Sequence, residues 1–295
     1  MLSGFDLEFT APKKLLRQVL ARKSCGDFIQ KGRLSTVIRT HDKHNIANLE
    51  NNRDGESHNN SWNCGVEGMT DDPKIEGLRL RQRRNFMAIL MLSLGVPMIS
   101  GGDEMGRTQQ GNNNAYCQDN FLSWTNWDLS KDEEEYLQFC EKLATIRQTQ
   151  PVLQRRKFFK GQLNEEVNPK KDIFWLNKDS SEMKQSDWNQ GHQYFGVVFD
   201  GQNIDEIDEE GRSVVGNTLL ILCNAHWEPI NFTLPPNVLS KNWQALSHRL
   251  LNKTWKLLIE TSGLLSPSCW GLQSAFLLEG RSIAVFELAE KDDNL

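Results

Sequence analysis

The spacing of apolar residues changes at Pro151, and this change constrains the fold more than any other feature of the sequence. Before it, apolar residues recur at helical spacing in two stretches, 71–94 and 130–150. After it, short β-branched or aromatic runs are separated by Gly, Pro, Asn and Asp. The runs are 172–177, 193–200, 218–225, 230–234, 254–259 and 283–288. We therefore expect helices followed by an all-β sandwich, with a boundary near 151–160.

Both predicted helices carry terminal signals. Asp71 or Asp72 can cap the first helix, and Gly95 ends it. The second helix begins with a capping box in which Ser130 and Glu133 satisfy each other's backbone N–H groups. These signals are local, so they predict where each helix begins without reference to the rest of the chain.

Between the two helices, the apolar run 98–100 predicts a very short strand that ends at Gly101, and an Asn-rich loop follows at 111–120. Helix, strand and polar loop in this order are typical of an α/β barrel or a doubly wound sheet. Asp103 and Glu104 are adjacent at the predicted strand end, so their side chains would point to opposite sides and could not flank one bond.

Composition excludes several classes of function. The chain has 34 basic and 39 acidic residues, which gives a net charge of -5. The sequence therefore lacks the excess of positive charge that would predict nucleic-acid binding. The longest apolar run, 87–98, is interrupted and shorter than the ~20 residues of a membrane span. The six cysteines form no CxxC pair, which favours a reducing compartment such as the cytoplasm. We expect no membrane segment, no cofactor and no metal site, and interpret the acidic stretch 205–210 as a hairpin tip.

Tryptophans near polar residues suggest a carbohydrate ligand. Trp62, Trp124 and Trp127 lie close to clusters of Asn, Asp, His and Arg. Sugar rings stack on aromatic faces while amides and carboxylates bind their hydroxyls. The alternative is that these tryptophans are anchors of a hydrophobic core, and the sequence alone does not separate the two interpretations.

Several long motifs resemble one enzyme family. They are KHNIANLENNRDG at 43–55, GVPM at 95–98 before GDE at 102–104, GNNNAYCQDN at 111–120, SEMKQSDWNQ at 181–190, the stretch 204–212, and LCNAHWEPINFTLP at 222–235. Together they resemble the C-terminal half of isoamylase-type debranching enzymes. These α-amylase-superfamily glycosidases hydrolyse α-1,6 branch points of glycogen, amylopectin or limit dextrins. The resemblance covers about 43 to 290.

The resemblance implies a fold of the α/β plus all-β class. Residues 1–35 stay unassigned, 36–153 would be the C-terminal remnant of a TIM (β/α)8 barrel, and 154–295 would be the terminal β-sandwich domain. It also implies branched α-glucan as the substrate class. A plastid would replace the cytoplasm as the location if the source were a photosynthetic eukaryote.

The family's catalytic carboxylates are mostly missing from this sequence. Retaining glycosidases need a nucleophile and an acid/base carboxyl group about 5 to 5.5 Å apart. The family takes the first from a GFRFD-like strand end, which does not occur here, and nothing before His41 resembles the strand that carries the second. We therefore expect this chain alone to be catalytically inactive.

Asp42 is the one remaining catalytic candidate, and it can be aligned in two ways. Read after the β-prone run 36–40, His41 and Asp42 resemble the family's His-Asp pair, in which Asp stabilises the transition state. Read as part of THDKHN at 40–45, the same residues resemble the family's YNDKHN, which makes Asp42 an ordinary loop residue. The second alignment needs no deletion.

The resemblance also implies glucan-binding residues in the loop after the predicted strand. They are Asn113, Asn114, Tyr116 and Asp119, together with Trp124. The alternative is a loop whose Asn side chains bond only its own backbone.

Two hypotheses follow for the whole chain. It is either the C-terminal part of a debranching enzyme or a non-catalytic, α-glucan-binding or regulatory subunit of the same family. A barrel fragment would also expose strand edges and the apolar face at 86–94, so we expect self-association or pairing with a complementary chain.

Overall fold

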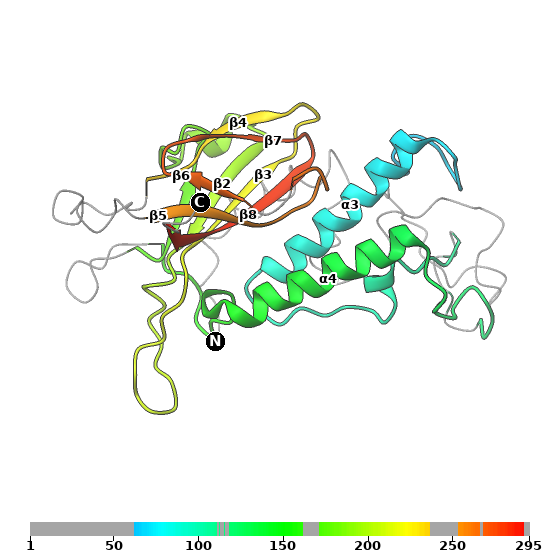
Figure 1. Ribbon diagram of the computed structural model, residues 1–295, viewed down its shortest axis with the longest axis horizontal. Helices are drawn as coiled ribbons and strands as arrows, with labels where there is room; N and C mark the ends of the chain where they lie inside the picture. Colours follow the sequence, from blue (N-terminus) through cyan, green and yellow to red (C-terminus); the bar gives the residue numbers. More distant parts are fainter. Residues whose placement is uncertain are drawn as a thin grey trace, which may run out of the picture. The chain divides into compact units, whose positions relative to one another are not determined.

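The computed structural model describes two compact units of the chain (Figure 1). The described residues are 62–110, 112, 115, 118–161, 171–236, 253–265 and 268–291. Within them, the helical unit comprises residues 62–91 and 97–142. The sheet unit comprises 92–96 and the described residues from 143 onward.

Both predicted helices are confirmed. Helix α3 spans Pro73–Leu92, and helix α4 spans Lys131–Thr149. Asp72 caps α3, because its Oδ1 accepts a hydrogen bond from the backbone N–H of Lys74 at 2.8 Å. The capping box of α4 is also present: the backbone N–H of Ser130 donates to Glu133 Oε2 at 2.8 Å, and that of Glu133 donates to Ser130 Oγ at 3.4 Å.

The two helices run side by side (Figure 1), and within the helical unit the guanidinium of Arg84 on α3 lies 5.8 Å from the ring centroid of Phe139 on α4. Phe86, Met87, Ala88, Met91 and Leu92 are buried. The expectation that the apolar face at 86–94 would be exposed is therefore wrong for most of its residues, because these side chains enter the core of the described structure.

The strand predicted at 98–100 is not formed. These residues have no regular secondary structure, and Met98 is 74% exposed. A strand requires a neighbour whose backbone completes its hydrogen bonds, and every strand that the structure describes pairs within the sheet unit. Asp103–Met105 is a 3-10 helix, η2, so Asp103 and Glu104 do not stand at a strand end.

The sheet unit contains a six-stranded antiparallel sheet with strand order β1-β2-β3-β8-β5-β6 and a two-stranded sheet, β4-β7. The six predicted β runs all became strands, while β6 and β7 were not predicted. The bounds are β1 Ile173–Leu176, β2 Tyr194–Phe199, β3 Leu219–Asn224, β4 Ile230–Thr233, β5 Lys253–Glu260, β6 Cys269–Gly271, β7 Ala275–Leu278 and β8 Ser282–Glu290.

The two sheets share one hydrophobic core, as the predicted sandwich requires. Phe232 of β4 and Phe276 of β7 pack with Trp255 of β5 and Phe286 of β8, and Figure 1 shows the small sheet lying over the larger one. The Phe276 and Phe286 rings meet edge to face at 4.9 Å. Buried aromatic rings therefore join the layers.

The segment that follows α4 packs against the opposite face of the large sheet. This segment begins with the 3-10 helix η3, Pro151–Leu153, whose Val152 and Leu153 are buried. Further along, the Phe159 ring stacks on Phe199 of β2 at 4.6 Å. Strand β3 is buried at all six positions and therefore on both faces, which explains why its sequence is almost continuously apolar rather than alternating.

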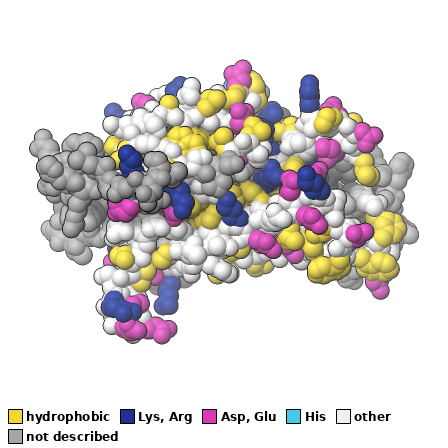
Figure 2. Space-filling view, viewed as in Figure 1, with side chains coloured by type: hydrophobic (Ala, Val, Ile, Leu, Met, Phe, Trp, Pro, Cys, Tyr) yellow, Lys and Arg dark blue, Asp and Glu magenta, His cyan; other side chains and the backbone are white. Residues whose placement is uncertain are grey.

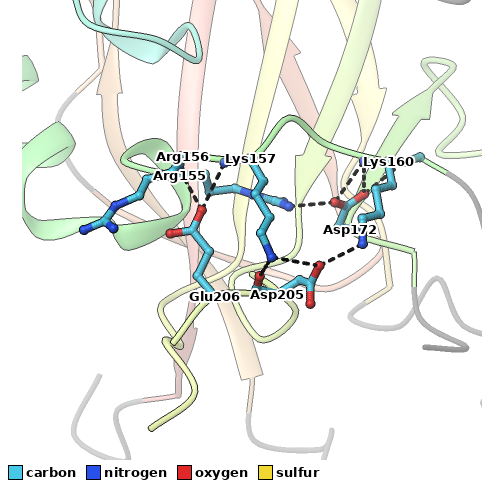
Figure 3. Close-up of polar contacts among 8 residues, drawn as sticks. Arg155, Arg156, Lys157, Lys160, Asp172, Asp205 and Glu206 are labelled. Carbon is cyan, nitrogen blue, oxygen red and sulfur yellow. Dashed lines mark hydrogen bonds and ion pairs between the residues drawn. The ribbon is translucent and has the colours of Figure 1, made fainter. Parts of the chain in front are cut away.

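A buried ion pair attaches this segment to the first strand (Figure 3). Arg155 Nη2 lies 2.9 Å from Asp172 Oδ2, and the two side chains are 0% and 7% exposed. Asp172 also accepts hydrogen bonds from the backbone N–H groups of Lys160 and Gly161, at 3.1 and 3.0 Å. The guanidinium carbon of Arg155 lies 4.3 Å from the Phe159 ring centroid.

A second, exposed layer of contacts surrounds the pair (Figure 3). Lys160 Nζ lies 2.8 Å from Asp205 Oδ2. Glu206 Oε1 accepts hydrogen bonds from the backbone N–H groups of Arg156 and Lys157, at 2.6 and 3.1 Å. These contacts attach the acidic stretch 205–210, which turns back on itself through an antiparallel bridge between Ile207 and Ser213.

Removing one partner of the buried pair should destabilise the sheet unit. Asp172→Ala leaves the Arg155 guanidinium buried without its counter-charge, so we expect the free energy of unfolding to fall by about 3–5 kcal/mol. Urea denaturation followed by circular dichroism measures this change. The control is Asp205→Ala, which removes exposed ion pairs and should cost less than about 1 kcal/mol. Equal losses for the two variants would contradict a special role for the buried pair.

Candidate functional site

Only part of the predicted site lies in the described structure. Asp42, Asn113, Asn114 and Tyr116 fall outside the described residues, so their roles stay predictions. Asp119 and Trp124 are described, and both belong to the loop that precedes α4 in the helical unit.

The structure brings Asp119 and Trp124 into direct contact. The indole Nε1–H of Trp124 donates a hydrogen bond to Asp119 Oδ1 at 2.9 Å. The indole is nevertheless 61% exposed. Its polar edge is therefore held by the carboxylate while much of the ring remains accessible to a ligand.

Local hydrogen bonds shape the backbone beneath this ring. The backbone N–H of Trp124 donates to the carbonyl of Asn120 at 3.0 Å. The Asn120 side chain accepts from the N–H of Leu122 at 2.9 Å and donates to Gln118 at 3.1 Å. An Asn side chain thus does hold its own loop, as the alternative interpretation expected, but the same turn also positions an exposed indole.

Two further aromatic side chains are exposed in the same loop. Phe121 is 65% exposed and Trp127 is 80% exposed. Figure 2 shows hydrophobic side chains exposed on the surface of the helical unit. Trp124 and Trp127 are therefore not core anchors in the described structure. Sequence reasoning missed Phe121, although its place between Asn120 and Trp124 could have indicated it.

The groups exposed in this loop are of the kinds that bind sugars. Exposed indole and phenyl faces can stack on pyranose rings, and the nearby amide and carboxylate groups can bind hydroxyls. The carboxylates of Asp103 and Glu104 make local contacts. Glu104 Oε2 accepts a hydrogen bond from the backbone N–H of Gly102 at 3.0 Å, and Asp103 Oδ1 forms an ion pair with Arg107 Nη2 at 3.5 Å.

Neither a metal-binding cluster nor a membrane-spanning helix occurs among the described residues. They contain no group of three or more His, Cys, Asp or Glu side chains placed to hold a metal ion. None of the helices in the described ranges is long and apolar enough to cross a membrane.

Comparisons with known proteins identify relatives of one kind. The sequence is 46% identical over 211 residues to the glycogen operon protein GlgX homolog of Mycobacterium tuberculosis, a match that covers 71% of this chain. It is 33% identical over 225 residues to the glycogen debranching enzyme of Dickeya chrysanthemi, covering 76% of this chain. This chain belongs to the isoamylase-type debranching enzyme family.

Further comparisons define how much of this debranching family the chain represents. The chain spans 29% of the length of the M. tuberculosis relative and 31% of the Dickeya enzyme. Chloroplastic isoamylase 1 of Arabidopsis thaliana is 46% identical over 115 residues, covering 39% of this chain and 15% of that protein. No protein-family model matches the sequence.

Among solved structures, a pullulanase from Anoxybacillus sp. LM18-11 in complex with maltotetraose matches 72% of this chain and 24% of its own chain. The sequence identity is 14% and the TM-score is 0.46.

The buried thiols of this family member are poor nucleophiles. Burial raises the pKa of Cys140 to about 12, although a hydrogen bond with Tyr136 acts in the opposite direction. Burial also raises the pKa of Cys223, in β3, to about 12. Cys269, in β6, is exposed.

Alkylation should separate these thiols. At pH 8, a thiol with a pKa of about 12 is ionised in about one molecule in ten thousand. We therefore expect iodoacetamide to modify Cys269 rapidly and to leave Cys140 and Cys223 unmodified in the folded chain, as measured by peptide mass spectrometry. Unfolding in urea should make all three react at similar rates, which is the control. Labelling of Cys140 at the rate of Cys269 in the folded chain would contradict this assignment.

Proposed function

We propose that this chain is the C-terminal part of a glycogen or starch debranching enzyme that hydrolyses α-1,6 bonds in branched α-glucans. The observation that carries the proposal is the 46% identity over 211 residues with the GlgX homolog. The chain's long motifs, such as GNNNAYCQDN at 111–120, also resemble this family.

The helical unit would then form the end of a TIM barrel. Two neighbouring helices with a polar loop before α4 are compatible with the outer layer of such a barrel. The exposed run 98–100 would find its strand neighbours in the rest of the barrel. Association with a complementary chain or with a second copy of this chain stays a prediction of the same proposal.

Hydrolysis should require more than this chain contains. The sequence has no GFRFD-like segment to supply a nucleophile and nothing before His41 that resembles the strand of the acid/base residue. A transition-state role for Asp42 would not replace either group, because the leaving oxygen still needs a proton donor. We therefore propose that the chain alone is inactive.

A reducing-sugar assay tests this proposal. Purified chain incubated with amylopectin should release reducing ends no faster than the buffer blank, because the two carboxyl groups of the retaining mechanism are missing. The positive control is a full-length isoamylase-type relative assayed in parallel. Release of reducing ends above the blank by this chain, with linear α-1,4 chains as the product, would refute the inactive assignment while supporting debranching activity.

A second candidate function is binding of α-glucan without hydrolysis. The specific observation in its favour is the exposed Trp124 indole held by Asp119, with Phe121 and Trp127 in the same loop. Stacking on these rings needs no catalytic carboxylates. Under this proposal, Asn113, Asn114 and Tyr116 would bind glucan hydroxyls beside the aromatic rings.

Affinity electrophoresis in amylopectin gels tests the binding proposal. We expect the chain to be retarded, and we expect Trp124→Ala to weaken binding about tenfold or more, as the loss of a central aromatic contact commonly does. Tyr116→Ala should act in the same direction. The matched control is Phe158→Ala, which removes an exposed aromatic ring from the sheet unit. Absence of retardation, or equal retardation of the chain and Trp124→Ala, would remove this candidate.

A further inference from the structure

An exposed tryptophan also lies in the sheet unit, in the turn between β3 and β4. Trp227 is 56% exposed. Its ring stacks on that of His226, with 4.0 Å between the centroids and 27° between the planes. One face of the indole is therefore covered by imidazole, while more than half of the residue's surface remains in water.

The turn beneath Trp227 is fixed by a buried amide. Asn224 is buried at the end of β3. Its Oδ1 accepts from the N–H of His226 at 2.9 Å, and its Nδ2 donates to the carbonyls of Glu228 and Glu279 at 2.9 and 3.0 Å. The Asn224 side chain thus bonds the turn on both sides of Trp227 and also the loop before β8. These bonds restrict the conformation of the backbone that carries Trp227.

The loop before β8 packs directly against the same turn. The N–H of Arg281 donates to the carbonyl of His226 at 2.8 Å. A Cβ atom on Gly280 would lie 2.1 Å from the carbonyl oxygen of Trp227, so only glycine allows this approach. The indole is thus presented on a preorganised support, which lowers the conformational entropy lost on binding.

Hydrogen-bonding groups flank the indole. The N–H of Glu228 donates to Nδ1 of His226 at 3.1 Å, so the neutral imidazole carries its hydrogen on Nε2 and can donate it to a hydroxyl. The side chain of Glu228 is itself largely exposed, and its carboxylate can accept hydrogen bonds from two vicinal hydroxyls.

A second pair of rings lies on the adjacent strand. Tyr194 of β2 is the register partner of Asn224, and the N–H of Ala225 donates to the carbonyl of Gln193 at 2.7 Å. The ring of His192 lies 5.0 Å from that of Tyr194. The start of β2 and the end of β3 therefore bring two aromatic pairs to the same end of the large sheet.

We propose that this end of the sheet unit, centred on Trp227 and His226, is a second contact surface for α-1,4-linked glucose chains. The inference rests on the proposed function, which supplies glucan as the ligand class. One pyranose ring would stack on the free face of the Trp227 indole, while His226 Nε2 and the Glu228 carboxylate bind its hydroxyls. A predominantly apolar partner would not use these flanking polar groups.

Fluorine NMR of the full chain labelled with 5-fluorotryptophan tests the proposal at single residues. Trp227→Phe and Trp124→Phe assign the two resonances. Titration with maltoheptaose, which contains no α-1,6 bond, should shift the Trp227 resonance in a saturable manner, and cellobiose at the same concentration should not shift it. Glu228→Gln and His226→Ala should each weaken maltoheptaose binding at Trp227 several-fold. Circular dichroism would verify that each variant is folded.

The outcomes separate this proposal from the proposed function. A saturable shift at Trp227 supports the second surface whether or not Trp124 responds. A shift at Trp124 alone overturns the second surface and leaves glucan binding by the loop before α4 intact. The absence of a shift at both residues, or equal shifts with cellobiose and maltoheptaose, also overturns it. Because maltoheptaose offers no branch point, none of these outcomes depends on debranching activity.

Discussion

The buried pair between Arg155 and Asp172 is the contact on which the arrangement of the sheet unit depends. Two desolvated charges favour folding only where their geometry is good and their remaining atoms are compensated. Asp172 meets this condition through two backbone N–H groups. Arg155 meets it only in part: its Nε and Nη1 have no hydrogen-bond partner among the described residues, and the guanidinium lies over Phe159 instead. The pair therefore specifies where the segment after α4 lies against β1 and β2.

Local signals explain what could be predicted from the sequence. Asp72 and Ser130 cap their helices through contacts within four residues, and such contacts form in any surrounding structure. The six predicted runs are five to eight residues long and rich in apolar, β-branched or aromatic residues. By contrast, β6 and β7 are three and four residues long with exposed positions, and they exist because β5 and β4 offer them backbone partners. Runs of three and four residues are too short for the sequence alone to indicate that pairing.

The errors and omissions have the same origin. The run 98–100 looks like a strand because it is apolar, but strand formation depends on a neighbour, and none of the described strands pairs with it. The family resemblance selected Asp119 as a candidate, and the polar residues around Trp124 also suggested that tryptophan. Their hydrogen bond, in contrast, required the turn formed by Asn120. Arg155 and Asp172 are 17 positions apart and look like ordinary surface charges, because sequence alone does not reveal that both are buried.

Binding and hydrolysis place different demands on a chain of this family. A retaining glycosidase needs two carboxyl groups held about 5 to 5.5 Å apart by strands that are distant in sequence. An exposed indole needs only a turn: Asp119 and Asn120 suffice for Trp124, and Asn224 suffices for Trp227. Each of these turns is completed by hydrogen bonds within its own unit. Glucan contact can therefore be a property of the helical unit and of the sheet unit separately, whereas hydrolysis can arise only where a complete barrel brings its carboxylates together.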